Sequence, residues 1–259
     1  MMASDELVLV TGASSGIGRE LARCFAADGC RLILTARRQP ELDALAAELK
    51  ARSGNDVTVI LADLAQADGI SALLATLQQR NLSPDVLVNN AGFGARGEFT
   101  RMPAERLAAM LAVNVDAVTA LAHALLPAMR ERQRGGILNV ASTAAFQPGP
   151  YMAAYYASKA YVLSLSEALF TECRADGVAV TCLCPGATAT GFAAQANVEG
   201  SLLFRLGQMH VTAVAHAGYA GFRSGRALVI PGWRNKLGVQ ALRVSPRALV
   251  RKLISRLQH

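Results

Sequence analysis

Apolar and polar positions along this chain form blocks that predict strands separated by helices. Seven short runs are predominantly apolar, as expected for strands buried on both faces of a parallel sheet. They occupy residues 7–10, 31–35, 57–61, 85–88, 136–140, 178–183 and 227–230. The stretches between them have helical patterns, which cover residues 16–27, 40–52, 69–80, 103–132 and 155–174.

Regular alternation of strand and helix favours an α/β fold. Right-handed crossovers would then give a doubly wound sheet of seven parallel strands with helices on both faces. The chain shows no internal repeat and no low-complexity linker. We therefore expect a single domain over residues 1–240, followed by a basic extension over residues 241–259.

The extension predicts an amphipathic helix over residues 246–258. Pro246 suits its first turn, and Ser245 its cap. An apolar stripe consists of Leu249, Val250, Leu253, Ile254 and Leu257, and it is flanked by Arg247, Arg251, Lys252 and Arg256. Such a stripe either packs against protein or lies on an anionic membrane. Packing is the expectation, with Leu253 and Leu257 buried.

The net charge of +7 is unevenly distributed. Residues 200–259 contain ten Lys and Arg and no Asp or Glu, whereas residues 1–199 carry a small net negative charge. A basic end on an acidic body is not typical of a nucleic-acid domain. It indicates an anionic neighbour such as a lipid surface, an acidic carrier or another subunit.

The remaining composition points to a cytoplasmic protein. No run of about 18 uncharged apolar residues occurs, so we expect no transmembrane span. The N-terminal residues include acids where a signal peptide needs bases. The five cysteines and four histidines lack metal-binding spacing, so we expect small buried thiols in a reducing compartment and no metal.

A glycine-rich turn follows the first predicted strand and opens the first helix. Its glycines are Gly12, Gly16 and Gly18, with Ser14, Ser15 and Ile17 between them. Glycines in this place let the backbone approach a pyrophosphate at the positive end of the helix. The turn therefore predicts a nucleotide-binding site.

The second predicted strand ends in Arg37 and Arg38, where an acid would accept the ribose hydroxyls of NAD. Guanidinium groups there suit a 2′-phosphate, so NADP(H) is expected in preference to NAD(H). The alternative is that both arginines are solvated surface charges. Asp63, followed by Leu64, ends the third strand and could accept from an adenine amino group.

Tyr155 and Lys159 are four residues apart, so they share one face of a helix. A free phenol has a pKa of about 10, and a nearby cation should lower it. Such a tyrosine can exchange a proton with an alcohol or ketone, and Ser142 could hold the carbonyl oxygen. Tyr156 also lies near Lys159, and we expect it to be a packing aromatic.

These motifs, taken together and in order, resemble the short-chain dehydrogenase/reductase family over nearly the whole chain. The matching residues are Thr11, Gly12, Gly16, Gly18, Asp63, Asn89, Asn90, Ala91, Gly92, Asn114, Ser142, Tyr155, Lys159, Pro185 and Gly186. The resemblance implies a Rossmann-type sheet and a nicotinamide cofactor. It also implies a catalytic tetrad of Asn114, Ser142, Tyr155 and Lys159, in which Asn114 helps to hold a proton-relaying water.

The resemblance extends to the cofactor and substrate contacts. It adds Asn90, Ala91, Gly92, Pro185, Gly186, Thr188 and Thr190 to the cofactor site, and Phe93 to the substrate site beside Ser142 and Tyr155. A substrate lid is expected at about residues 188–225, with a helix-rich part at 198–223. Its apolar residues are Leu202, Leu203, Phe204, Leu206 and Met209. The resemblance also implies a homodimer or a homotetramer.

The sequence thus predicts an NADP(H)-dependent oxidoreductase that interconverts a secondary alcohol and a ketone or aldehyde. Two alternatives remain. One is a 3-oxoacyl or hydroxysteroid-type reductase that docks on an acyl carrier or a membrane. The other is a non-catalytic NADP-binding sensor, which would keep the glycine turn but lose the tetrad.

Overall fold

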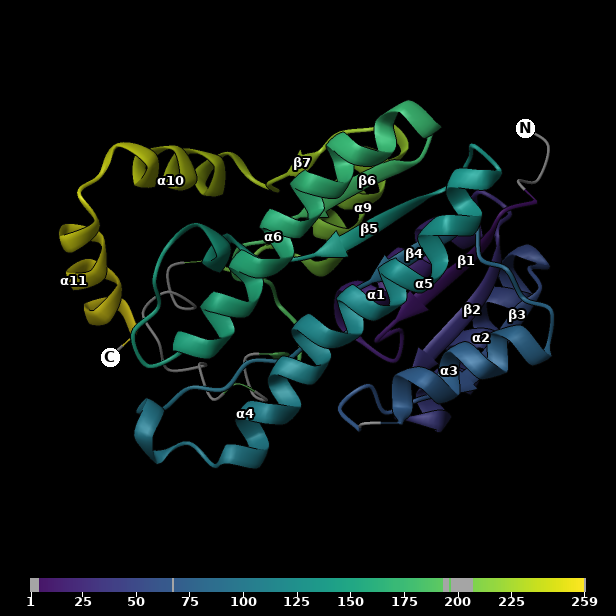
Figure 1. The fold of residues 1–259 in the computed structure, drawn as a ribbon, viewed down its shortest axis with the longest axis horizontal. Helices are drawn as coiled ribbons and strands as arrows, with labels where there is room; N and C mark the ends of the chain where they lie inside the picture. The colour runs from purple at the N-terminus through teal and green to yellow at the C-terminus, as the bar shows by residue number, and fades with distance from the viewer. Residues whose placement is uncertain (1–4, 67, 193–195, 197–206, 259) are drawn as a thin grey trace.

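Seven parallel strands form one twisted sheet at the centre of the protein (Figure 1). The computed structural model describes residues 5–66, 68–192, 196 and 207–258. The strands are β1 (Leu7–Thr11), β2 (Arg31–Ala36), β3 (Val57–Leu61), β4 (Val86–Asn89), β5 (Gly136–Val140), β6 (Ala179–Leu183) and β7 (Leu228–Val229). Their order is β3-β2-β1-β4-β5-β6-β7. The chain winds outward in both directions from β1 and β4, so the doubly wound α/β prediction is confirmed.

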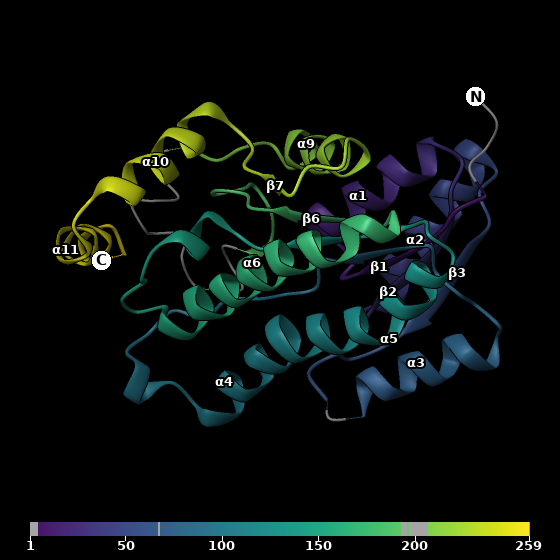
Figure 2. The ribbon, with the colours of Figure 1, turned by 45° about the horizontal axis from the view of Figure 1, so that its top comes forward.

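Helices cover both faces of this sheet (Figure 2). The α-helices within the described residues are α1 (Gly16–Ala27), α2 (Gln39–Ser53), α3 (Gly69–Gln79), α4 (Ala104–Leu111), α5 (Ala117–Glu131), α6 (Ala153–Cys173), α9 (Val211–Arg223), α10 (Trp233–Val244) and α11 (Arg247–Gln258). Side chains of α1, α2 and α9 pack on one face, and those of α3 and α5 on the other. Strand side chains alternate accordingly: Val8 and Val10 face α1, whereas Leu7 and Leu9 face α5.

The long helix predicted over residues 103–132 contains a change of helical pitch. α4 and α5 are joined by a π-helical segment, η2 (Ala112–Asp116). By length and composition alone, the stretch Ala104–Glu131 could cross a membrane. Leu121 and Met129 of this stretch are fully buried in the cluster on the sheet.

The segment expected to form a substrate lid contains α9, which packs on the sheet. Within α9, Val214, Ala215 and Phe222 are buried in the same cluster as α1 and the sheet. The lid expectation is therefore wrong for α9, because its apolar face is needed to cover the sheet. Leu202, Leu203, Phe204 and Leu206 lie outside the described residues.

The C-terminal residues form two helices where one was predicted. Ser245 ends α10, and its hydroxyl donates to the Ala241 carbonyl of that helix at 2.7 Å. Its expected role as the cap of α11 stays a prediction. Val250 and Ile254 are buried, but the Leu253 side chain is 53% exposed, so its expected burial is wrong. Successive residues of a helix point about 100° apart. Val250 and Ile254 therefore face the body, whereas Leu253 points elsewhere. The side chain of Leu257 lies outside the described part.

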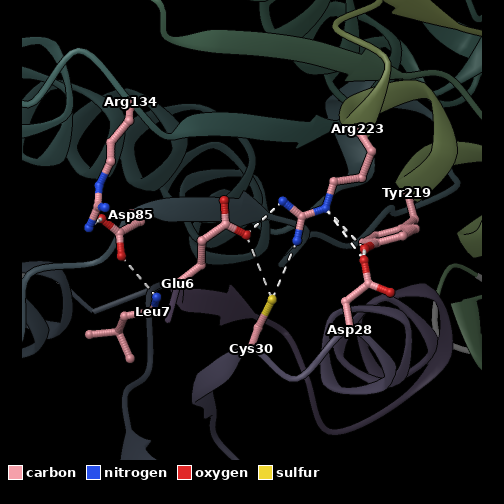
Figure 3. Close-up of polar contacts among 8 residues, drawn as sticks. All are labelled: Glu6, Leu7, Asp28, Cys30, Asp85, Arg134, Tyr219 and Arg223. Atoms are coloured by element: carbon pink, nitrogen blue, oxygen red, sulfur yellow. Dashed lines mark hydrogen bonds and ion pairs between the residues drawn. The ribbon is translucent and has the colours of Figure 1, made fainter. Parts of the chain in front are cut away.

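Polar contacts join α9 to the edge where β1 begins (Figure 3). The guanidinium of Arg223 pairs with Glu6 at 2.6 Å and donates to the Cys30 thiol at 3.4 Å. It also lies 5.2 Å from the centre of the Phe25 ring, and Tyr219 beside it donates to Asp28. One arginine therefore holds together α9, the start of β1 and the turn between α1 and β2.

Nearby, Asp85 accepts the backbone N–H of Leu7 at 3.0 Å and pairs with Arg134 at 3.4 Å (Figure 3).

All five cysteines are buried and free, as expected. Cys182 and Cys184 of the β6 region bring their sulfurs to 3.7 Å, because alternate residues of a strand share a face. Among the described residues, no group of His, Cys, Asp and Glu could hold a metal ion.

Arg223→Met should lower the free energy of unfolding by about 1–2 kcal/mol, since it removes a cation–π contact and a partly exposed ion pair. Chemical denaturation would measure this change. Arg226→Met is the matched control: its side chain is exposed, and its change should stay within about 0.5 kcal/mol. Equal unfolding free energies for the two variants would contradict the role given to Arg223.

Candidate active site

A cleft of about 720 Å³ opens at the carboxyl ends of the central strands. This is where ligands bind in open parallel sheets, at the point where the strand order reverses. The predicted site residues that line it are Gly12, Ser14, Ser15, Gly16, Ile17, Arg37, Arg38, Asp63, Leu64, Asn90, Ala91, Gly92, Phe93, Ser142, Tyr155, Lys159, Pro185, Gly186, Thr188 and Thr190. Gly18 and Asn114 do not line it; they lie directly behind its wall.

The glycine turn presents the N-terminus of α1 to the cleft. Gly12 has a φ of +66°, and a Cβ there would lie 2.8 Å from the Asn90 side-chain nitrogen, so a glycine is required. Ser15 begins α1 with an extended backbone and makes no side-chain cap. The first N–H groups of a helix need a partner. An uncapped positive helix end in a cleft fits a pyrophosphate.

Hydrogen bonds from the end of β4 hold this turn in place. The Thr11 hydroxyl accepts the N–H groups of Asn90 and Ala91, both at 3.0 Å. The Asn90 amide donates to the Thr11 carbonyl at 2.9 Å. A Cβ on Gly18 would collide with the same amide, so Gly18 permits close packing of α1 on β4. Asn90 and Gly18 therefore position the turn from behind.

The arginines at the end of β2 have different surroundings. Both side chains are exposed at the edge of the cleft. Arg38 donates to the Ser14 hydroxyl at 3.1 Å and pairs with Glu41 at 3.1 Å. Arg38 is thus tied to the glycine turn, and it is not a purely solvated charge. Arg37 lines the cleft beside it.

Two further segments complete the cofactor end. Asp63 follows β3, and one of its carboxylate oxygens accepts the Ala65 N–H at 3.1 Å. Thr190 comes after β6, and its methyl group would lie 3.3 Å from a Cβ on Gly16. Thr188 donates to the Gly186 carbonyl at 2.9 Å. The chain after β6 therefore passes over the glycine turn, where the resemblance predicted contacts to the cofactor.

The opposite wall carries the hydroxyl and phenol groups. Ser142 follows β5; its hydroxyl accepts the Ala144 N–H at 3.1 Å and donates to the Pro185 carbonyl at 3.4 Å. Tyr155 and Lys159 lie one turn apart on α6, as predicted, and both are buried. The Tyr155 ring is tilted against Phe192, with 5.4 Å between ring centres.

Lys159 reaches the carboxyl end of β5. Its Nζ donates to the Val140 carbonyl at 2.9 Å. A Cβ on Gly92 would lie 3.2 Å from this nitrogen and 3.0 Å from the Asn114 side-chain oxygen. The absence of a side chain at Gly92 therefore leaves the lysine and the asparagine close together.

Asn114 belongs to the π-helical segment, a kind of distortion often found at functional sites. Its oxygen accepts the Phe93 N–H at 3.1 Å, and its amide donates to the Phe93 carbonyl and to Ser158, both at 3.0 Å. These bonds fix the loop after β4 against α6. The expected role of Asn114 in holding a water stays a prediction.

Burial controls the protonation of the tyrosine and the lysine. It raises the pKa of Tyr155 well above its ordinary value, and a hydrogen bond with Ser142 partly opposes the rise. The expectation that Lys159 lowers this pKa is wrong for the protein alone, because desolvation of the phenol dominates. Burial also lowers the pKa of Lys159 from 10.5 to about 8. Tyr155 is therefore protonated at neutral pH.

Tyr156 has the packing role that the sequence indicated, although it also touches the cleft. Its ring packs against Gly149, where a Cβ would collide with it. Its centre lies 6.0 Å from that of Tyr155, in an edge-on arrangement. Both tyrosines belong to one apolar cluster with Met152.

Sequence reasoning missed several residues at this end of the cleft. Ala144, Gln147, Met152 and Phe192 line it beside Phe93. Met152 comes directly before α6 and three residues before Tyr155, and this spacing is a signal that could have placed it. Nothing in the pattern around Phe192 indicates its contact with Tyr155, because the segment reaches the cleft only through the fold.

Comparison with known proteins gives matches along most of the chain. The family described as short chain dehydrogenase matches residues 6–200. The probable oxidoreductase EphD of Mycobacterium tuberculosis is 38% identical over 212 residues, which make up 79% of this chain. The chain spans 36% of that relative's length, about a third.

Solved structures agree over a larger share. A short-chain dehydrogenase from Sphingobium yanoikuyae in complex with NADPH is 34% identical, with a TM-score of 0.84 over 94% of both chains. A bulky-bulky ketone specific alcohol dehydrogenase from Comamonas testosteroni is 31% identical, with a TM-score of 0.78 over 92% of both. Because the family match runs through both the glycine turn of α1 and the Tyr155–Lys159 turn of α6, this chain belongs to the short-chain dehydrogenase/reductase family.

Proposed function

We propose that this protein is an NADP(H)-dependent oxidoreductase that interconverts a secondary alcohol and a ketone or aldehyde. One observation carries the proposal. A single cleft has an uncapped helix N-terminus at one end and the buried set of Ser142, Tyr155 and Lys159 at the other. The first suits the phosphates of a dinucleotide, and the second suits a carbonyl oxygen.

The residues of the wall divide the chemistry between them. A bound nicotinamide cofactor supplies or accepts the hydride. Ser142 and Tyr155 hold the substrate oxygen, and Tyr155, protonated at neutral pH, gives the proton during carbonyl reduction. Lys159 remains largely charged below its pKa of about 8 and places a positive charge near the oxygen as negative charge develops. Asn114 positions the loop after β4 from behind.

The substrate end of the cleft favours an apolar ketone. Its lining includes Phe93, Met152, Tyr156 and Phe192. Such side chains stabilise a bound apolar substrate by burying its apolar surface. The Comamonas testosteroni neighbour, described as specific for bulky-bulky ketones, supports this substrate class. Ketones with an aromatic or long alkyl group on each side are the first substrates to test.

Arg37, Arg38 and Ser14 support the choice of NADP(H). They lie together at the end of β2, and Arg38 already donates to the Ser14 hydroxyl. A 2′-phosphate would accept hydrogen bonds from these groups and balance their charge. The NADPH in the Sphingobium yanoikuyae neighbour agrees with this choice.

A non-catalytic sensor is disfavoured, since all four tetrad residues are present and three of them line the cleft. A cytoplasmic location and a homodimeric or homotetrameric state stay predictions. Docking on an acyl carrier has no separate support in the site itself.

Tyr155→Phe should abolish nearly all turnover while NADPH binding survives, because the proton donor is lost and the glycine turn is intact. Tyr156→Phe is the matched control and should keep most activity. NADPH oxidation with a panel of bulky ketones measures turnover, and fluorescence titration measures binding. If Tyr156→Phe is instead the inactive variant, the assignment of the proton donor is reversed.

The wild-type enzyme should use NADPH about tenfold to hundredfold better than NADH, as charge-assisted hydrogen bonds contribute about 1.5–3 kcal/mol. Arg37→Ala/Arg38→Ala should remove most of this preference by raising KM for NADPH, with kcat little changed. The ratio of kcat/KM for the two cofactors measures it. Equal use of both cofactors by the wild type would refute the proposed role of the two arginines.

The buried Lys159 should make stability depend on pH. Its pKa is about 8 in the folded state and 10.5 as a free side chain, so the unfolded state binds more protons between these values and stability rises with pH there. Relative to Lys159→Met, the wild type should gain about 2 kcal/mol of unfolding free energy between about pH 7.5 and about pH 10.

Denaturant unfolding of the wild type and of Lys159→Met at both pH values measures this difference in unfolding free energy. The contributions of the other titrating groups are shared by the two proteins and largely cancel. Lys50→Met serves as the control, since Lys50 is exposed on α2. A constant difference between wild type and Lys159→Met across this range would show that the lysine is not desolvated in the folded protein.

A further inference from the structure

The two C-terminal helices lie at the end of the protein opposite the N-terminus in both views (Figures 1 and 2). We call them the C-terminal pair, Trp233–Val244 and Arg247–Gln258. Nine large apolar side chains are exposed among the described residues, and five of them are on this pair: Trp233, Leu237, Val244, Leu249 and Leu253. A group of exposed apolar side chains of this kind marks a surface that interacts with a protein or a membrane.

The pair is anchored to the body by its other face. Val250 and Ile254 of α11 are buried, and they share an apolar cluster with Met152, Tyr155 and Tyr156. Leu249 and Leu253 stand on the neighbouring row of the same helix and point away from that cluster. The fold therefore holds α11 in place while presenting leucines to the outside.

Positive charge surrounds this apolar surface. Seven basic side chains of the pair are exposed: Arg234, Lys236, Arg243, Arg247, Arg251, Lys252 and Arg256. The sequence has no acid after Glu199. No ion pair found among the described residues involves any of the seven, whereas arginines of the body such as Arg23, Arg130 and Arg223 are paired.

We propose that the C-terminal pair docks this protein on the surface of an anionic phospholipid membrane. Exposed leucines and a tryptophan can enter the headgroup boundary, while the bases meet lipid phosphates. Trp233, the one tryptophan of the chain, is 70% exposed, and amphipathic rings of this type favour that boundary. The expectation from sequence favoured packing on protein, but the exposure of Leu249 and Leu253 leaves that surface uncovered.

A second copy of this chain fits the surface less well. A two-fold dimer places the same patch on both subunits. Seven bases would then face seven bases without an acid between them, and like charges repel. A lipid surface provides the opposite charge and an apolar layer together.

Docking by this surface would also bring the cleft close to the membrane. The cluster that anchors α11 contains Tyr155 and Met152, which line the substrate end of the cleft. An apolar ketone dissolved in the bilayer would have a short path to that end. This consequence rests on the proposed function, whereas the docking itself does not.

The test uses vesicles without substrate or cofactor, so its result does not depend on enzyme activity. Vesicles of phosphatidylcholine alone are compared with vesicles that contain about 30 mol% phosphatidylglycerol. Flotation measures bound protein. Trp233 emission reports insertion, because its signal comes from one residue on the pair. We expect a blue shift and binding with the anionic vesicles, and a loss of at least about tenfold in affinity between about 50 mM and about 500 mM salt.

Two sets of variants separate charge from apolar contact. Arg247→Gln/Arg251→Gln/Lys252→Gln should weaken binding to anionic vesicles at least about tenfold. The control variant is Lys50→Gln/Arg80→Gln/Arg174→Gln, which removes three exposed bases outside the C-terminal pair. It should bind the vesicles as tightly as the wild type does.

Leu249→Gln/Leu253→Gln should also weaken binding and remove the blue shift of Trp233. The exposed Leu61 and Leu111 provide the control, Leu61→Gln/Leu111→Gln. Circular dichroism and an unchanged melting temperature confirm folding of each variant. Absence of binding to anionic vesicles overturns the proposal, as does equal loss of binding in the control variants. A dimer that dissociates in Leu249→Gln/Leu253→Gln, without vesicle binding by the wild type, would assign the surface to a second copy.

Discussion

The structure of the site depends on one buried cation at the carboxyl end of β5. An ammonium group placed there needs hydrogen bonds, because burying a charge without a partner is costly. The Val140 carbonyl accepts from Lys159, and the missing side chain of Gly92 leaves the space around it. Tyr155 takes its position one turn earlier on the same helix. Ser142 follows β5 in the chain, so the three groups meet because one strand and one helix are fixed together.

That attachment is itself polar and buried. The Asn89 amide of β4 donates to Asn139 of β5 at 2.9 Å, and Asn139 donates to Ser166 of α6 at 2.9 Å. Chains of satisfied hydrogen bonds in a low-dielectric interior favour one arrangement of the elements they join. At the cofactor end, by contrast, the N–H groups of α1 have no side-chain cap.

The C-terminal pair follows a different rule from the body. In the body, several arginines pair with acids, as Arg223 pairs with Glu6. On the pair, bases and apolar side chains remain exposed side by side. The other row of α11, Val250 and Ile254, belongs to the buried apolar cluster that contains Met152 and Tyr155. The basic end of the sequence is thereby anchored to the body through a cluster that also reaches the cleft.

Elements and chemistry that depend on short spacing could be predicted from the order of the residues. Continuous apolar runs gave the seven strands, and the turn from Gly12 to Gly18 and the four-residue step from Tyr155 to Lys159 are local patterns with local causes. Features that depend on distant neighbours follow only from the packing of the fold. It placed α9 on the sheet, raised the pKa of Tyr155 through burial, and left Leu253 exposed. An apolar side chain or a titratable group has the same local sequence whether or not another element covers it, so burial and its consequences follow only from the packed fold.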